Sequence, residues 1–150
     1  NVTANNYILF PFALGNETKT VKVNYMPEET GNTYISDDGN REIELKMLDY
    51  LKLPKIDYIK IDAEGFEMEV IKGGLILVER DKPFIHVEVK NKILEKHGLI
   101  PSDIDKFFTE LNYELKMKFK SIIVMALFLM PFMSNGKKSS ITTALVRIDL

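Results

Sequence analysis

Apolar and polar residues alternate in the first third of the chain in a way that predicts β-strands. The clearest alternation covers residues 19–26, where valine and tyrosine side chains fall on one face, as in a half-buried strand. The apolar stretch 7–14 predicts an earlier strand, which its internal proline confines to a sheet margin. A polar loop over 27–40 precedes a predicted strand at 42–47, and residues 49–53 predict a short helical turn.

The strongest pattern lies in the middle of the chain. Residues 56–62 are rich in isoleucine and predict a buried strand, and residues 84–89 predict another. Between them, residues 66–79 repeat apolar side chains at helical spacing and predict one helix. A strand, a helix and a second strand in this order form a right-handed crossover between parallel strands. The middle of the chain therefore predicts an α/β fold with a mostly parallel sheet.

The last third predicts a helix and two further strands. The helix begins at Pro101, and Ser102 followed by Asp105 approximates a capping box. Residues 119–130 and 141–150 predict strands joined by a turn-rich segment. Their closeness in sequence predicts that the two strands pair with each other in an antiparallel arrangement.

Composition limits the function classes that remain. The 150 residues carry 22 acidic and 20 basic side chains, so a general nucleic-acid surface is not expected. The chain has no cysteine, which excludes disulfides, zinc fingers and cysteine nucleophiles, and its two histidines are too few for a three-histidine metal site. The longest apolar run, 122–133, is shorter than the roughly 20 residues that cross a bilayer. No leader follows Asn1, so we expect a cytoplasmic protein without a membrane span.

The densest polar cluster follows the predicted strand 56–62. Asp62, Glu64 and Glu67 place three carboxylates at the carboxyl end of this strand, the edge at which open α/β sheets bind ligands. These acids can orient an amine or hydroxyl, act as a base, or hold a divalent cation. They can equally cap the helix and form a solvated turn, and the residues alone do not decide between these readings.

Three further polar residues lie in the two central predicted strands, 56–62 and 84–89. Lys60 lies in a strand expected to be covered, so it needs a partner, for which Glu64, Glu67 and Glu88 are the candidates. His86 is predicted to be a hydrogen-bonded core residue. Glu88 falls on the same strand face near the ligand-binding edge and is a weak site candidate.

Four segments form a recognisable series along the chain. The first is a leucine-aspartate pair in 47–51, and the second, in 56–67, is a strand that ends in Lys-hydrophobe-Asp and is followed by Glu-Gly-x-Glu. The third is a Lys-Gly pair in 70–74, and the fourth is a proline-led strand that ends in Glu in 82–88. In this order and spacing they resemble the hallmark of the FkbM family of methyltransferases. Residues 10–15 also resemble the family's third strand, which ends in Ala-Leu-Gly. The likeness covers about residues 5–115.

The resemblance implies a class I, Rossmann-like fold and methyl transfer from S-adenosylmethionine. The acceptor would be an oxygen of a sugar, polyketide or other small molecule. On this reading Ala13 and Leu14 border the adenine, and Asp62 lies beside both the sulfonium methyl and the acceptor. Glu64 and Glu67 would shape or polarise the acceptor pocket.

The resemblance also implies that residues 1–150 are a partial methyltransferase domain, because no Gly-rich loop between a strand and a helix is present. In the family this cofactor loop would lie upstream of Asn1. Residues 116–150 are either the terminal strand pair of such a domain or unrelated sequence. The alternative function is a non-catalytic α/β binding module, and a weaker one is a divalent-metal site at Asp62, Glu64 and Glu67.

Overall fold

The structure is a computed structural model that describes residues 8–28, 33–89, 94–95, 98–114, 123–124 and 143–147. Its strands are β1 (Ala13–Leu14), β2 (Lys19–Asn24), β3 (Tyr34–Ile35), β4 (Arg41–Lys46), β5 (Tyr58–Asp62), β6 (Phe84–Val89), β7 (Ile123–Val124) and β8 (Thr143–Arg147). Its helices are η2, a 3-10 turn at Leu48–Tyr50, followed by α1 (Glu67–Lys72), α2 (Leu75–Asp81) and α4 (Pro101–Glu110).

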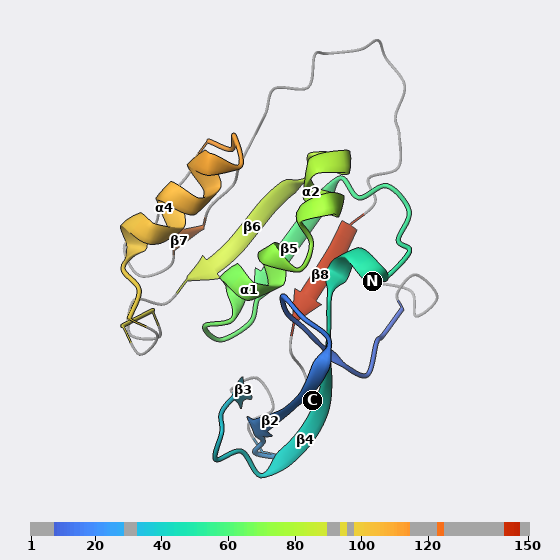
Figure 1. Cartoon of the computed structure of the whole chain (residues 1–150), viewed down its shortest axis with the longest axis vertical. Helices are drawn as coiled ribbons and strands as arrows, with labels where there is room; N and C mark the ends of the chain where they lie inside the picture. The colour runs from blue at the N-terminus through green and yellow to red at the C-terminus, as the bar shows by residue number, and fades with distance from the viewer. Residues whose placement is uncertain are drawn as a thin grey trace.

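The strands form two four-stranded sheets. In the first, with the order β1-β4-β2-β3, β4 pairs in parallel with β1 and antiparallel with β2. In the second, with the order β7-β6-β5-β8, β5 lies parallel to both β6 and β8. Figure 1 shows the arrows of β6 and β8, on either side of β5, pointing the same way. The predicted parallel unit of strand, helix and strand is therefore confirmed, within a mixed rather than a mostly parallel set of strands.

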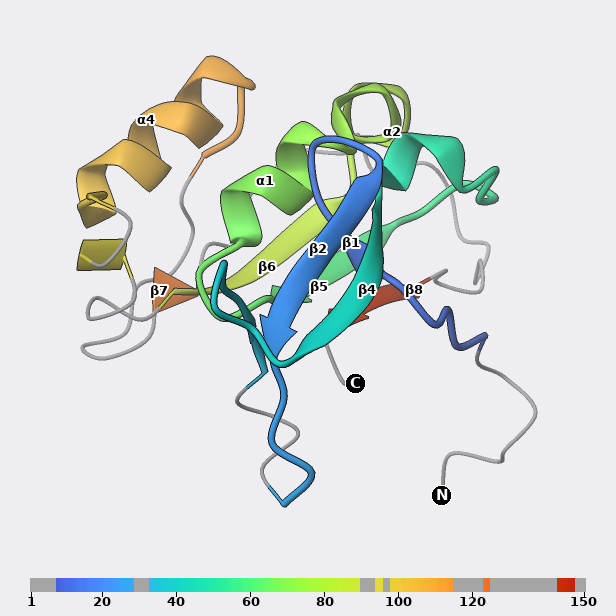
Figure 2. The ribbon, with the colours of Figure 1, turned by 60° about the horizontal axis from the view of Figure 1, so that its bottom comes forward.

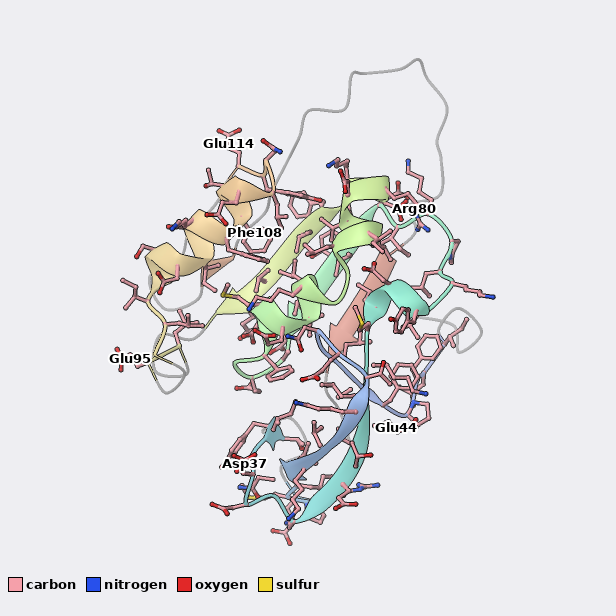
Figure 3. All side chains as sticks on the ribbon, in the orientation of Figure 1. Asp37, Glu44, Arg80, Glu95, Phe108 and Glu114 are labelled. Atoms are coloured by element: carbon pink, nitrogen blue, oxygen red, sulfur yellow. The ribbon has the colours of Figure 1, made fainter. Side chains whose placement is uncertain are left out.

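The helices cover one face of the second sheet. Figure 2 shows α1, α2 and α4 on the same side of β5, β6 and β8. The strand residues on that face and the apolar helix residues that pack on them form one buried cluster, which includes Ile59, Ile61, Ile85, Val87, Val70, Ile71, Leu77, Val78, Ile104 and Phe108. In Figure 3, Phe108 lies between α4 and β6. Helix burial on one face leaves the other face of β5 and β6 to polar side chains.

The predicted antiparallel pairing of the last two strands is wrong. β7 pairs antiparallel with β6 and β8 pairs in parallel with β5, so they lie on opposite edges of the second sheet. The described parts of these strands are residues 123–124 and 143–147, and the rest of the predicted ranges lies outside the described residues. The central pair β5–β6 has one open edge on each side, and β7 pairs with the edge of β6 while β8 pairs with the edge of β5. Local turn signals do not carry this information.

The single helix predicted over residues 66–79 is also wrong, because the chain breaks between α1 and α2. Gly73 ends α1 and Gly74 precedes α2. A Cβ atom on Gly73 would lie 1.8 Å from the backbone oxygen of Gly15, and one on Gly74 would lie 2.8 Å from Cδ2 of Leu48. The break therefore allows the helix pair to approach the end of β1 and the turn η2 closely.

Asp49 of η2 caps the second half of the broken helix. Its two carboxylate oxygens accept hydrogen bonds from the backbone N–H groups of Ile76 and Leu77, at 3.1 and 2.8 Å. Its own N–H donates to the backbone oxygen of Gly73 at 2.9 Å. Asp49 of the leucine-aspartate pair thus fixes the start of α2 to η2.

Replacing Asp49 with alanine should lower the free energy of unfolding by about 1 kcal/mol, the usual cost of removing a helix cap. Asp49→Asn keeps one acceptor oxygen and should lose less. Urea unfolding of both variants measures the difference, with Glu79→Ala on α2 as the control for loss of an acid. An Asp49→Ala variant as stable as Glu79→Ala would contradict the capping role.

Two smaller expectations also change. Of the described residues 8–14 of the predicted strand 7–14, only Ala13 and Leu14 are in a strand, and Ile8 and Leu9 are strongly exposed. Pro11 stands in this stretch, and it cannot donate to a strand ladder. The loop predicted at 27–40 includes the short strand β3.

The helix predicted to begin at Pro101 is confirmed as α4. The expected cap between Ser102 and Asp105 is wrong, because Asp103 accepts from the N–H of Ile100 at 2.9 Å. A carboxylate three residues into the helix reaches back to the residue before it, which is the acidic half of a capping box. None of the helices within the described residues has the length and apolar character needed to span a bilayer.

Candidate functional site

A tight turn at the carboxyl end of β5 carries the first part of the site. Glu64 and Gly65 both have positive φ angles, 46° and 102°. Such angles are uncommon for a residue with a side chain, so Glu64 adopts them only because its surroundings hold it there. The N–H of Phe66 donates to the backbone oxygen of Ala63 at 3.1 Å and closes the turn.

The carboxylate of Glu67 holds this turn from inside. Glu67 is only 5% exposed. Its Oε1 atom accepts hydrogen bonds from the N–H groups of Ala63 and Gly65, at 3.1 and 3.0 Å. Burial raises the pKa of Glu67 above its ordinary value and the charge of Glu64 adds to the rise, whereas the backbone hydrogen bonds lower it. Glu67 thus faces the backbone of the turn.

Asp62 ends β5 just before the turn and forms an ion pair on the polar face of the sheet. Lys60 Nζ lies 3.5 Å from Asp62 Oδ2 and 4.0 Å from Glu88 Oε2. The three side chains are 29%, 20% and 22% exposed for Lys60, Asp62 and Glu88. Of the partners expected for Lys60, Glu88 is confirmed. Asp62 is a second partner that the sequence did not indicate.

A histidine–tyrosine pair continues this polar face away from the strand ends. The hydroxyl of Tyr58 lies 2.9 Å from Nδ1 of His86, so the predicted hydrogen bonding of His86 is confirmed, although its side chain is partly exposed. Burial lowers the pKa of His86, and the charge of Lys60 lowers it further. Both effects favour the neutral form of His86 beside the Lys60 ammonium group.

The end of β1 lies next to the turn. Ala13 and Leu14 are buried, at 1% and 9% exposed, and pair with β4. The N–H of Gly15 donates to the backbone oxygen of Lys46 at 2.9 Å. A Cβ atom on Gly15 would lie 2.9 Å from Cε1 of Phe66, the residue that follows the turn. The two predicted parts of the site are thus neighbours, and the side chains of the Ala-Leu pair point into the core.

Sequence reasoning expected the pair of Lys60 with Glu88 but missed that Asp62 joins it. Alternation on β6 places Glu88 on the face of His86, and alternation on β5 places Asp62 on the face of Lys60. The parallel register, which pairs Lys60 with His86, is the additional fact that brings these faces together. With an assumed register, the sequence pattern would have indicated the contact.

The carboxylates do not form a metal centre. Among the residues that the structure describes, no group of three histidine, cysteine, aspartate or glutamate side chains could hold a metal ion. Glu67 accepts hydrogen bonds from the turn backbone. The idea of a divalent-metal site at Asp62, Glu64 and Glu67 is therefore not supported. The site offers partly exposed carboxylates at the carboxyl end of the parallel strands, next to a tight turn closed by hydrogen bonds.

Comparison with known proteins identifies the family. No curated protein and no solved structure matches the chain. A family model described as the methyltransferase FkbM domain matches residues 2–115, nearly the range over which the sequence resembles that family. This family implies an α/β methyltransferase fold and a methyl donor, and the helix-covered parallel strands agree with that class. Because the match spans most of its length, the chain belongs to the FkbM methyltransferase family and is a methyltransferase by that membership.

Proposed function

We propose that the protein transfers a methyl group from S-adenosylmethionine to a hydroxyl oxygen of a small molecule such as a sugar, on a Rossmann-like domain. The observation that carries this proposal is the position of Asp62. Its carboxylate ends a central parallel strand, is one-fifth exposed, and adjoins a turn held by a buried glutamate. Ligands of open α/β sheets bind at this edge.

The charge of the site suits a sulfonium donor. Asp62 and Glu88 are two carboxylates paired with the ammonium group of Lys60, and these three side chains together carry a formal charge of minus one. A monocationic ligand beside such a group is stabilised, because partial burial weakens the screening by water. S-Adenosylmethionine, when bound, supplies an electrophilic methyl group and leaves as the neutral S-adenosylhomocysteine.

The side chains of the site then have distinct roles. Asp62 accepts the proton of the acceptor hydroxyl while the hydroxyl oxygen forms its new bond to the methyl carbon, which is general-base catalysis. Glu64, held on the rigid turn, lines the acceptor side. Glu67 contributes by fixing the turn, so that the reactants are held in line. The β1 end at Ala13 and Leu14 borders the adenine with its backbone, because both side chains are buried.

Calorimetric titration with S-adenosylmethionine and S-adenosylhomocysteine tests the donor. We expect both to bind, because both carry the adenosine and amino-acid groups. No heat from either ligand at millimolar concentration would overturn the proposal and favour a non-catalytic binding module.

Incubation with methyl-labelled S-adenosylmethionine and a panel of monosaccharides and methyl glycosides tests the acceptor class. We expect the label in an ether, which resists base. Label found only on amines, or only in base-labile esters, would contradict transfer to a hydroxyl oxygen.

A further inference from the structure

Lys60 connects the ends of two neighbouring parallel strands. β5 and β6 are in register at Ile61 and Val87, so the next residues along the two strands are Asp62, the last residue of β5, and Glu88, the last but one of β6. Lys60 Nζ lies within 4.0 Å of a carboxylate oxygen of each. One ammonium group therefore holds two acids that would otherwise repel each other across the strand pair.

This lysine is better shielded than comparable ones on the molecule. Its side chain is 29% exposed, against 34% for Lys46 and 41% for Lys72, and each of those two pairs with one glutamate. Burial lowers the pKa of the neighbouring His86, and the charge of Lys60 lowers it further. Its polar surroundings on this face are Tyr58, His86 and the two carboxylates, and Arg147 of β8 stands opposite Asp62 in the strand register.

We propose that Lys60 is a positioning residue of the methyltransferase site. With Glu88 as a second anchor, it keeps the carboxylate of Asp62 at the strand end, facing the bound donor. The inference rests on the proposed function. Without the ammonium group the two carboxylates repel and turn apart into solvent, so the sulfonium loses its nearest negative charge.

The ratio of affinities for S-adenosylmethionine and S-adenosylhomocysteine reports on this role, because the two ligands differ at the charged sulfur. A lysine needed only for folding would, when removed, weaken both ligands equally. A lysine acting only through its charge would, when removed, raise the preference for the cation. A positioning lysine would, when removed, lower that preference.

The experiment is a double-mutant cycle with Lys60→Met and Asp62→Asn, read by calorimetry with both ligands. We expect Lys60→Met to lower the affinity ratio by about three- to tenfold, which lies within the range of coupling between contacting residues. In the Asp62→Asn background the same change should have no further effect, because it acts through Asp62. Lys60→Arg should keep the ratio, since the guanidinium can bridge both carboxylates.

A matched control removes a different strand lysine. Lys46 on β4 pairs with Glu44 at 2.9 Å, and Glu44 lies on that strand in Figure 3. The two residues are two positions apart in sequence, as Lys60 and Asp62 are. Lys46→Met should leave the affinity ratio unchanged. The inference would be overturned if the affinity ratio rises or stays constant in the Lys60→Met variant. It would also be overturned if the effects of Lys60→Met and Asp62→Asn on the ratio simply add in the double variant. Each of these outcomes leaves the proposed function intact.

A second variant covers the case in which Lys60→Met does not fold. Glu88→Gln leaves Lys60 to neutralise Asp62 alone, so the affinity ratio should fall by about threefold, at the low end of such coupling. An unchanged ratio would overturn the inference. No binding of either ligand by the unaltered protein would instead remove the proposed function, and the inference with it.

Discussion

Replacing Gly73 with alanine is expected to destabilise the protein by about 3 kcal/mol or more, at the upper end of the cost of overpacking. The added Cβ atom would lie 1.8 Å from the backbone oxygen of Gly15 and 2.8 Å from its carbonyl carbon. Neither atom can rotate away as the tip of a side chain can. The backbone of β1 or of the helix pair must therefore move, and this displaces the buried end of β1 from the site.

Gly74→Ala is the matched control for this prediction. The three atoms nearest to its Cβ atom would all be side-chain atoms of Leu48, the closest at 2.8 Å, and a leucine can shift its rotamer. We expect a loss of about 1 kcal/mol, at the low end of the same range. Urea unfolding midpoints of the two variants measure the difference. Equal midpoints would mean that the contact between Gly73 and Gly15 is less rigid than its geometry indicates.

The same glycine pair explains why the helix was predicted incorrectly. The apolar spacing from Phe66 to Leu77 continues through the glycines, and a glycine inside a helical pattern is only mildly unfavourable. The break arises from the approach of Gly15 and Leu48, which lie far away in sequence. The strands β5 and β6 were predictable because their apolar runs need no distant partner to be recognised.

Strand partners in the tail illustrate the same limit. The apolar character of residues 123–124 and 143–147 predicts strands, and both are strands. Pairing depends on which sheet edges remain open, and the edges of β5 and β6 are set by the whole fold. Closeness in sequence favoured a hairpin, although the two strands lie on opposite edges.

The residue types of the sequence indicated the candidate site, but they did not indicate which way its side chains point. Three carboxylates at a strand end indicated a site without distinguishing their roles. The positive φ angles of Glu64 and Gly65 turn the backbone N–H groups inward, toward Glu67. A positive φ at a glutamate is uncommon, so the sequence did not indicate this turn and left open whether the acids form a ligand site or a solvated turn.

Replacing Glu67 with alanine is expected to lower the free energy of unfolding by about 3 kcal/mol, because the N–H groups of Ala63 and Gly65 lose their acceptor. The strained turn at Glu64 loses its support in the same step. Glu67→Gln keeps an oxygen that can accept both hydrogen bonds, so its stability should stay close to that of the unaltered protein at acidic pH, where Glu67 is protonated. S-Adenosylhomocysteine binding should survive in the glutamine variant and be lost in the alanine variant.

The pH dependence of stability separates the charge of Glu67 from its hydrogen bonds. Burial raises the folded-state pKa of Glu67 above its ordinary 4.5, so the folded state binds the proton more tightly than the unfolded state. This contribution to stability is full below pH 4.5 and is lost as the pH rises through the raised value. Glu67→Gln does not titrate, so its stability should gain on the unaltered protein across that window. Unfolding by urea at a series of pH values measures the gain. A constant difference would mean that the backbone hydrogen bonds to the carboxylate offset the effect of its burial, so that its pKa is not raised in the folded state.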